Sequence, residues 1–389
     1  MSDFCCGVRR DVQCRFCCRK ATEMPSNDKL HRAKKQKNNE FYTQYADIEK
    51  EMNAYIEYNP DVFRDKTILL PCDDPEWSNF TKYFAQNFER FGLKKLISTS
   101  YAADSKPKNI PYQPTLFETE SPKFDKNKTR KHGKIFVLER DINKDKKINI
   151  NDLEWDYLEG DGDFRSKEVT KLRDEADFII TNPPFSLLRE FFNWVVQSGK
   201  LFCMIGSLNL ITYKDPFPYL LKNKIWMGAT CFNGGATYFI ADPALYEPEK
   251  MSNPKHAYIK DGIFYWRVNG IRWYTNIDHG RRHRPTPLMT MEENLKFNKR
   301  IRDIGYRKYD NYNAIEIPHF SAIPSDYSGY MGVPISFLDK YCPEQFVIIN
   351  PGICKTKPTN DLIAPGLDGW HIDKKRKFAR IFIKHKEQP

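Results

Sequence analysis

The stretch from residue 177 to residue 185, DFIITNPPF, constrains the fold of this chain more than any other. Its apolar run at 178–181 contains β-branched residues and predicts a buried strand. That strand has to end at Pro183 and Pro184, because proline offers no backbone donor to a sheet ladder. A helix is predicted directly afterwards, at residues 187–197. A strand, a stiff loop and a helix in this order fit an open α/β sheet, in which ligands bind outside the carboxyl ends of the strands.

The loop after this strand carries groups that suit an amine and a planar ring. Asn182 offers a side-chain carbonyl as acceptor, and Pro183 offers a backbone carbonyl but no N–H. Two adjacent acceptors match the exocyclic amino group of a nucleobase, and the ring of Phe185 gives a flat base a face for stacking. For the tripeptide Asn-Pro-Pro alone, a loop that merely ends the strand is an equally good interpretation. The complete string from strand to helix favours a site.

The string resembles the catalytic motif of the S-adenosylmethionine-dependent amino-methyltransferases. EFYTQY at 40–45 resembles the motif that these enzymes place before the first strand, against the methionine end of the cofactor. Four further stretches are similar to motifs of one family among them, the EcoRI-type adenine-specific DNA methyltransferases: CDDP at 72–75, SNF at 78–80, GDGDFRS at 160–166 and MGVPI at 331–335. The resemblance extends from about Lys29 to the end of the chain, in matching order. It is more specific than NPPF alone, which guanine-N2 RNA methyltransferases also carry.

This resemblance implies an α/β fold: a Rossmann-like S-adenosylmethionine-dependent methyltransferase domain with a C-terminal DNA-recognition region. It implies transfer of a methyl group from S-adenosyl-L-methionine to N6 of a flipped-out adenine in double-stranded DNA, without a metal. The chain would be the modification half of a restriction-modification system, sharing its site with a cognate restriction endonuclease but forming no stable complex with it. An RNA base methyltransferase acting on guanine N2 or adenine N6, and a catalytically inactive DNA-binding module, remain the alternatives.

The resemblance also assigns residues to roles. The catalytic loop comprises Asn182, Pro183, Pro184 and Phe185, and the cofactor-binding residues are Phe41, Tyr42, Thr43, Asp73, Asp74, Asp163 and Phe164. Asp163 is expected to accept a hydrogen bond from the amino group of the cofactor adenine, while Phe164 packs on its ring. For Asp73 and Asp74 the alternative is helix capping. The chain departs from the usual pattern in two places: no glycine follows the strand at 67–72, and no ribose-binding acid ends the strand at 96–100.

The charge of the chain suits a polyanionic partner. Its 389 residues carry a formal net charge of +11, with a pI of about 9.0, and contacts to phosphate usually dominate nucleic-acid affinity. Beyond residue 241 arginines interleave with aromatic residues, and we expect Arg281, Arg282 and Arg284 to contact DNA. A second basic patch covers residues 374–377. A solvated cluster without a DNA contact is the alternative for both patches.

Three regions are expected along the chain: a basic, disordered leader at 1–39, a methyltransferase catalytic domain at 40–240 and a target-recognition region at 241–389. Cys14 and Cys17 form a CxxC pair in the leader, but no second pair follows that would complete a zinc site. Met24 is an alternative start. Aspartates and asparagines at 141–152 imitate the spacing of a calcium loop, with Lys146 where its glycine belongs, and are expected to form a solvated turn.

The remaining apolar runs predict the other elements of the fold. Strands are expected at 67–72, 96–100, 134–138, 201–205, 226–228 and 237–240, and helices within 40–58, 78–91 and 166–175. No apolar run has the length of a membrane span, and the first residues form no signal-peptide core. A soluble, cytoplasmic protein is therefore expected. We also expect it to be a monomer.

Overall fold

The structure of this chain is a computed structural model that describes residues 43–74, 78–102, 119, 121–232, 236–240, 257–260, 262–349, 370–377 and 380–386. All of them belong to one compact unit, Asn39–Pro389. The predicted leader at 1–39, with its cysteine pair, and the predicted cofactor residues Phe41 and Tyr42 lie outside the described residues. No helix within these segments is both long and apolar enough to cross a membrane.

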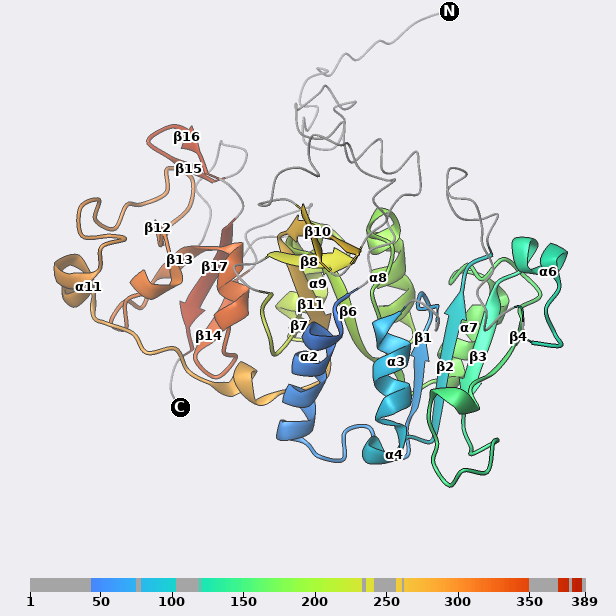
Figure 1. The fold of residues 1–389 in the computed structure, drawn as a ribbon. Helices are drawn as coiled ribbons and strands as arrows, with labels where there is room; N and C mark the ends of the chain where they lie inside the picture. Colours follow the sequence, from blue (N-terminus) through green and yellow to red (C-terminus); the bar gives the residue numbers. More distant parts are fainter. Residues whose placement is uncertain are drawn as a thin grey trace, which may run out of the picture. The chain divides into compact units, whose positions relative to one another are not determined.

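The largest sheet has eight strands in the order β4-β3-β2-β1-β5-β6-β11-β7 (Figure 1). Its central strands β2, β1, β5 and β6 are parallel. β3 runs antiparallel to β2, and β11 runs antiparallel to β6, so the sheet is mixed. The strands are β1 (Thr67–Leu70), β2 (Lys95–Ser100), β3 (Lys134–Leu138), β4 (Glu154–Tyr157), β5 (Phe178–Thr181), β6 (Leu201–Ser207), β7 (Trp226–Met227) and β11 (Ile271–Thr275).

Side chains that alternate along the central strands build two cores, one on each face of this sheet. Leu69 and Ile179 belong to a buried cluster with residues of α7 and α8, whereas Ile68 and Ile180 belong to a second cluster with residues of α2 and α3. Because helices cover both faces, the central strands are buried throughout and read as continuous apolar runs. The helices are α2 (Tyr45–Tyr58), α3 (Asn79–Gln86), α4 (Phe88–Phe91), α6 (Lys126–Lys131), α7 (Lys167–Glu175), α8 (Leu188–Gln197), α9 (Phe217–Leu221) and α11 (Met291–Phe297).

The later part of the chain forms smaller sheets. One has the order β8-β10-β9, another has the order β12-β13-β17-β14, and β15 and β16 form a two-stranded hairpin. Their strands are β8 (Ala236–Ile240), β9 (Ala257–Lys260), β10 (Ile263–Asn269), β12 (Ala314–Glu316), β13 (Tyr330–Pro334), β14 (Phe346–Ile349), β15 (His371–Ile372), β16 (Lys375–Arg376) and β17 (Arg380–His385).

The predicted α/β architecture is confirmed, and β3 and β5 have the predicted bounds. The strand predicted at 237–240 exists as β8, and it pairs with β10 in the three-stranded sheet. The sequence analysis did not predict β11, which lies between β6 and β7 in the large sheet.

The expected division of the chain between residues 240 and 241 does not coincide with a division of the core. β11 completes the large sheet from beyond this boundary. Met331 of β13 and Ile383 of β17 belong to the same buried cluster as Ile179 of β5 and Phe191 of α8. The chain leaves the large sheet and then returns to it, which a change of composition along the sequence cannot reveal. Target recognition beyond residue 241 stays a prediction about surface residues.

Candidate active site

The carboxyl ends of β1 and β5 lie where the order of the large sheet reverses. From β1 the chain continues to β2 on one side, and it later returns to the other side of β1 with β5. In open α/β sheets, ligands bind in the crevice outside such a switch point. Asp73 follows β1 and Asn182 follows β5, so both residues lie at the place that the sequence analysis predicted for the site.

Asp73 ties the ends of these two strands together. Its carboxylate is only 4% exposed and accepts hydrogen bonds from Thr181 Oγ1 at 2.5 Å and Ser78 Oγ at 2.6 Å. Ser78 also caps α3 by accepting from the backbone N–H of Phe80. Burial raises the pKa of Asp73 to about 7, although both hydroxyls favour the charged form. The carboxylate is engaged by protein hydroxyls, so a direct cofactor contact by Asp73 stays a prediction.

Thr43 brings the start of α2 to the same edge. Its backbone carbonyl accepts a hydrogen bond from Asn79 Nδ2 at 2.7 Å, at the first turn of α3. Asp74 is half-buried here, and its carbonyl accepts from the backbone N–H of Ser78. The hydroxyl oxygens of Thr43 and Ser100 are buried and form no hydrogen bond with any described residue. Two such hydroxyls suit a polar ligand with amino and ribose groups, because a buried polar atom without a partner is costly.

The loop at 160–164 lies against the end of β2. Gly162 has a φ of +85°, and a Cβ there would overlap the backbone oxygen of Ser100, so this position requires glycine. The backbone N–H of Ala102 donates to the carbonyl of Asp161 at 2.8 Å. The GDGDF stretch is therefore placed beside the predicted cofactor edge.

Asp163 is half-buried in this loop and pairs with its neighbour Arg165. It accepts from the backbone N–H, Nε and Nη2 of Arg165 at 2.8, 2.9 and 2.5 Å. Burial alone would raise the pKa of Asp163, but these bonds hold it below its ordinary value. The carboxylate is thus ionised near neutral pH and fit to accept a further hydrogen bond. Its contact with the cofactor adenine stays a prediction.

Phe164 lies in the core under α8. Its side chain is fully buried, with ring centroids 5.0 Å from Phe191 and 5.6 Å from Trp194 of α8. These contacts give the ring a packing role, and its contact with the cofactor stays a prediction. The sequence analysis missed Tyr101, which directly follows β2, is half-buried and helps to lower the pKa of the nearby Asp163 carboxyl. An aromatic residue directly after a predicted parallel strand was the signal that could have found it.

The Asn-Pro-Pro-Phe loop continues from the anchored end of β5. Asn182 directly follows Thr181, and its Oδ1 atom is shielded from solvent. Pro183 is buried, while Pro184 and Phe185 are half-buried. Phe185 packs against the cluster of α2 and α3 and begins a short 3-10 helix, Phe185–Leu187, that leads into α8. The four predicted catalytic residues therefore form one rigid connection at the switch point.

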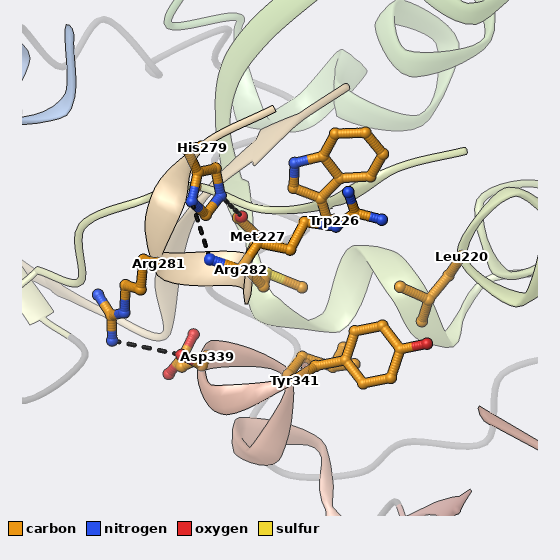
Figure 2. Close-up of a pocket in the computed structure, with 10 residues that line it drawn as sticks. Leu220, Trp226, Met227, His279, Arg281, Arg282, Asp339 and Tyr341 are labelled. Carbon is orange, nitrogen blue, oxygen red and sulfur yellow. Dashed lines mark hydrogen bonds between the residues drawn. The ribbon is translucent and has the colours of Figure 1, made fainter. Parts of the chain in front are cut away.

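Arg282 is held by contacts within the protein. It is only 8% exposed, and its guanidinium lies 3.7 Å above the ring of Trp226 (Figure 2). Its Nη1 donates to Asp278 at 3.2 Å and its Nη2 donates to Asn223 at 2.7 Å. This stacked and hydrogen-bonded guanidinium favours a structural role, and the predicted DNA contact of Arg282 stays a prediction.

Arg281 is half-buried beside it, and Arg284 is exposed. Arg281 donates to the carbonyls of Ala229 at 2.8 Å and Asp339 at 3.3 Å, and Figure 2 shows it lining a small pocket. It thereby connects the end of β7 with the 3-10 helix Ile335–Lys340. Of the three predicted arginines, Arg284 is the most exposed, and the DNA contacts of Arg281 and Arg284 stay predictions.

The acidic turn at 141–152 directs its oxygens at its own backbone. Asp141 accepts from the N–H groups of Lys144 and Lys146, and Asp152 accepts from those of Ile142 and Asn143. This is the geometry expected of a solvated turn. Within the described part of the chain, no group of three His, Cys, Asp or Glu side chains could hold a metal ion.

The sheet order and the acceptor-rich loop at its switch point together fit an amino-methyltransferase. The family described as "Adenine-specific methyltransferase EcoRI" matches residues 29–386 of this chain. The chain belongs to this family and is an adenine-specific methyltransferase, which confirms the sequence-based prediction.

Curated relatives match along nearly the whole chain. The chain is 37% identical over 361 residues to the Type II methyltransferase M.EcoRI of Escherichia coli, and this match covers 93% of this chain and 97% of the relative. It is 32% identical to M.MgeORF184P of Mycoplasma genitalium, where the match covers 92% of this chain and 99% of the relative. It is 31% identical to M.MpnI of Mycoplasma pneumoniae, where the match covers 92% of this chain and 98% of the relative. Both are also Type II methyltransferases by name. No solved structure matches the chain.

Proposed function

We propose that this enzyme methylates N6 of adenine in duplex DNA, with S-adenosyl-L-methionine as the methyl donor, as the modification half of a restriction-modification system. The observation that carries the proposal is the position of Asn182 and Pro183 at the switch point, on a strand end anchored by Asp73. The adenine specificity of the family and the Type II names of the relatives support it. So does the formal net charge of +11.

The chemistry follows from the two acceptors. The lone pair of the adenine amino group is delocalised into the ring, which makes N6 a weak nucleophile. Hydrogen bonds accepted by Asn182 Oδ1 and the Pro183 carbonyl localise that lone pair and fix its direction. N6 takes part in base pairing within the duplex, so the adenine has to be flipped out, and the half-buried ring of Phe185 offers it a stacking face.

The cofactor edge lies beside this loop. S-adenosylmethionine supplies the sulfonium methyl group when bound. Thr43 and Ser100 offer buried hydroxyls, and Asp163 with Tyr101 offers an ionised acceptor and a planar ring. Asp73 positions both sides of the site, since it holds Ser78 at the start of α3 and Thr181 before the catalytic loop.

The location, the oligomeric state and the partners of the enzyme follow from this function. A modification enzyme meets its DNA in the cytoplasm and acts alone as a monomer, while a cognate endonuclease recognises the same sequence without binding it stably. The residues beyond 241 that lie on the surface read the target. Arg284 is one of them, because it is exposed in the described structure.

The test compares the wild type with Asn182→Ala and a matched control, Asn193→Ala. Asn193 lies on α8, where its amide contacts Asp215 away from the catalytic loop. Transfer of a labelled methyl group to duplex DNA should fall about 100-fold or more in Asn182→Ala. The control variant should keep its activity, and cofactor affinity by calorimetry should be unchanged in both.

Three results would contradict the proposal. Near-normal methylation by Asn182→Ala would remove the catalytic role of the loop. Transfer by the wild type to RNA but not to duplex DNA would favour an RNA methyltransferase. Failure of the wild type to bind S-adenosylmethionine would favour an inactive DNA-binding module.

A further inference from the structure

The hairpin of β15 and β16 has an unusual turn at its tip. The strands pair His371 with Arg376 and Ile372 with Lys375, which leaves Asp373 and Lys374 as a two-residue loop. Both loop residues have positive φ, at 52° and 62°, which is the type I′ geometry that Asn-Gly normally fills. A residue with a Cβ is strained in this region, because the Cβ approaches the following carbonyl oxygen. The surrounding structure has to hold such a turn in place.

Asp310 stabilises this turn. Its carboxylate accepts from the backbone N–H groups of both turn residues, from Asp373 at 3.2 Å and from Lys374 at 2.8 Å. Its own N–H donates to the carbonyl of His371 at 2.9 Å. Arg307 adds an ion pair with the Asp373 carboxylate at 3.2 Å. The turn is therefore clamped by a neighbouring segment and not by its own sequence.

The segment that carries Asp310 packs against the C-terminal sheet. Tyr309 and Tyr312, on either side of Asp310, pack their rings 5.4 and 4.8 Å from Phe382 of β17. Ile372 of the hairpin belongs to the same buried cluster. The stretch Tyr309-Asp310-Asn311-Tyr312 thus connects the hairpin to a buried cluster of the C-terminal sheet.

The tip of this clamped hairpin is basic and exposed. Lys374, Lys375 and Arg376 follow one another and are all exposed, and the acid beside them, Asp373, is paired with Arg307. A two-stranded ribbon fits the major groove of B-DNA, and exposed cations at its tip are attracted to the phosphates that line that groove. We propose that the β15–β16 hairpin contacts the phosphate backbone of the target duplex and that Asp310 positions it. This inference rests on the proposed function, which makes duplex DNA the substrate.

The first test removes the two lysines. Lys374→Gln/Lys375→Gln is compared with Lys146→Gln/Lys147→Gln, which removes the same charge from another exposed turn. Lys146 has a φ of +67°, so the backbone of the control matches that of Lys374. The affinity for a duplex oligonucleotide is measured over a salt series, together with steady-state methylation.

If two phosphate contacts are lost, the slope of log affinity against log salt should become shallower by about 1.8, and binding at about 0.1 M salt should weaken about tenfold or more. The control should match the wild type. The KM for DNA should rise while kcat stays unchanged. Equal slopes for the hairpin variant and the control would overturn the inference while leaving the methyltransferase activity intact. A wild type that does not methylate duplex DNA would overturn the proposed function as well.

The second test addresses Asp310 as a positioning residue. Removing an acid makes the protein more positive, so charge alone predicts tighter DNA binding by Asp310→Ala. Loss of the clamp predicts the opposite, and we expect binding to weaken about threefold to tenfold. Asp310→Asn loses the same charge but keeps one acceptor oxygen, so it should bind DNA better than Asp310→Ala. Unchanged cofactor affinity verifies the fold, and tighter binding by Asp310→Ala would refute the clamp.

Discussion

At the scale of single residues, the buried carboxylate of Asp73 is the group whose protonation matters most for stability. Its pKa in the folded protein is about 7, against an ordinary value of 3.8, because burial disfavours the charged form. Between these two values the folded state binds more protons than the unfolded state. Stability therefore falls as the pH rises through this window, and the penalty is complete above the folded pKa.

Replacing Asp73 with Asn removes this ionisation and should change the pH dependence of stability. The stability of Asp73→Asn relative to the wild type should be higher at about pH 8 than at about pH 5, by about 2–3 kcal/mol in the free energy of unfolding. Urea denaturation at both pH values measures this difference. Asp163→Asn is the control, since the pKa of Asp163 is lowered and its carboxylate is ionised throughout this range. A constant difference between Asp73→Asn and the wild type would show that Asp73 is ionised in the folded state at both pH values.

Residue identity predicted the position of the site better than the direction of its side chains. Asn182 and Asp73 lie at neighbouring strand ends because parallel strands place their carboxyl ends at one edge. The sequence GDGDF could not show that Phe164 turns into the core while Tyr101 reaches the site edge. Nor could it show that Arg282 stacks on Trp226, since that contact joins residues 56 positions apart in number and depends on the packed fold.

At the scale of elements, β5 could be predicted to the residue because its apolar run is continuous and ends at two prolines. β11 could not be predicted, because its five buried residues include Arg272, which is only 7% exposed. The partner that makes this burial possible is Asp339, 67 residues later, which accepts from Arg272 Nε at 2.7 Å and from its Nη2 at 2.8 Å. Local sequence contains neither this partner nor the neighbouring strand β6.

This ion pair fastens the large sheet to the C-terminal part of the chain, and breaking it should be costly. Arg272→Met leaves the Asp339 carboxylate buried without its partner and should destabilise the protein by about 3–5 kcal/mol. The double variant Arg272→Met/Asp339→Leu should recover much of this loss, because no charge then remains buried. Urea denaturation of the single and double variants measures both effects.

An exposed pair supplies the control for this experiment. Arg302 and Asp303 form a surface ion pair with a distance of 3.0 Å, and Arg302→Met should change stability by less than about 1 kcal/mol. If Arg272→Met were as mild as this control, β11 would not depend on Asp339 for its place in the sheet.

At the scale of the whole molecule, one buried cluster contains residues of both the catalytic and the C-terminal sheet. Stretches such as 331–335, which resemble the family, are part of this packing. Gly332 of β13 is one example, because a Cβ there would overlap the hydroxyl of Tyr309. Likeness in these stretches therefore reports a shared scaffold. Phosphate contacts carry no sequence information, so we expect specificity to depend on other exposed residues beyond 241, with Arg284 as a candidate.

A shared scaffold places its exposed loops in the same way against the duplex, which leads to a prediction about the recognised sequence. The relative M.EcoRI is matched over 97% of its length, and the family matches residues 29–386, a range that includes the C-terminal sheet and the hairpin of this chain. We therefore expect plasmid DNA from cells that express this chain to resist the EcoRI endonuclease. A plasmid carrying the Asn182→Ala variant is the control and should be cut.

Digestion and long-read sequencing of the same plasmid separate the possible results. A single changed side chain at a base contact alters discrimination by about 1–3 kcal/mol, so a few surface substitutions suffice to move the site. If the plasmid is fully cut but carries N6-methyladenine at another motif, the surface substitutions have changed the recognised sequence and the chemistry of the Asn182 loop is intact. If the plasmid is fully cut and carries no methyladenine, the activity itself is contradicted, because a protein with this scaffold and this loop would then not methylate DNA.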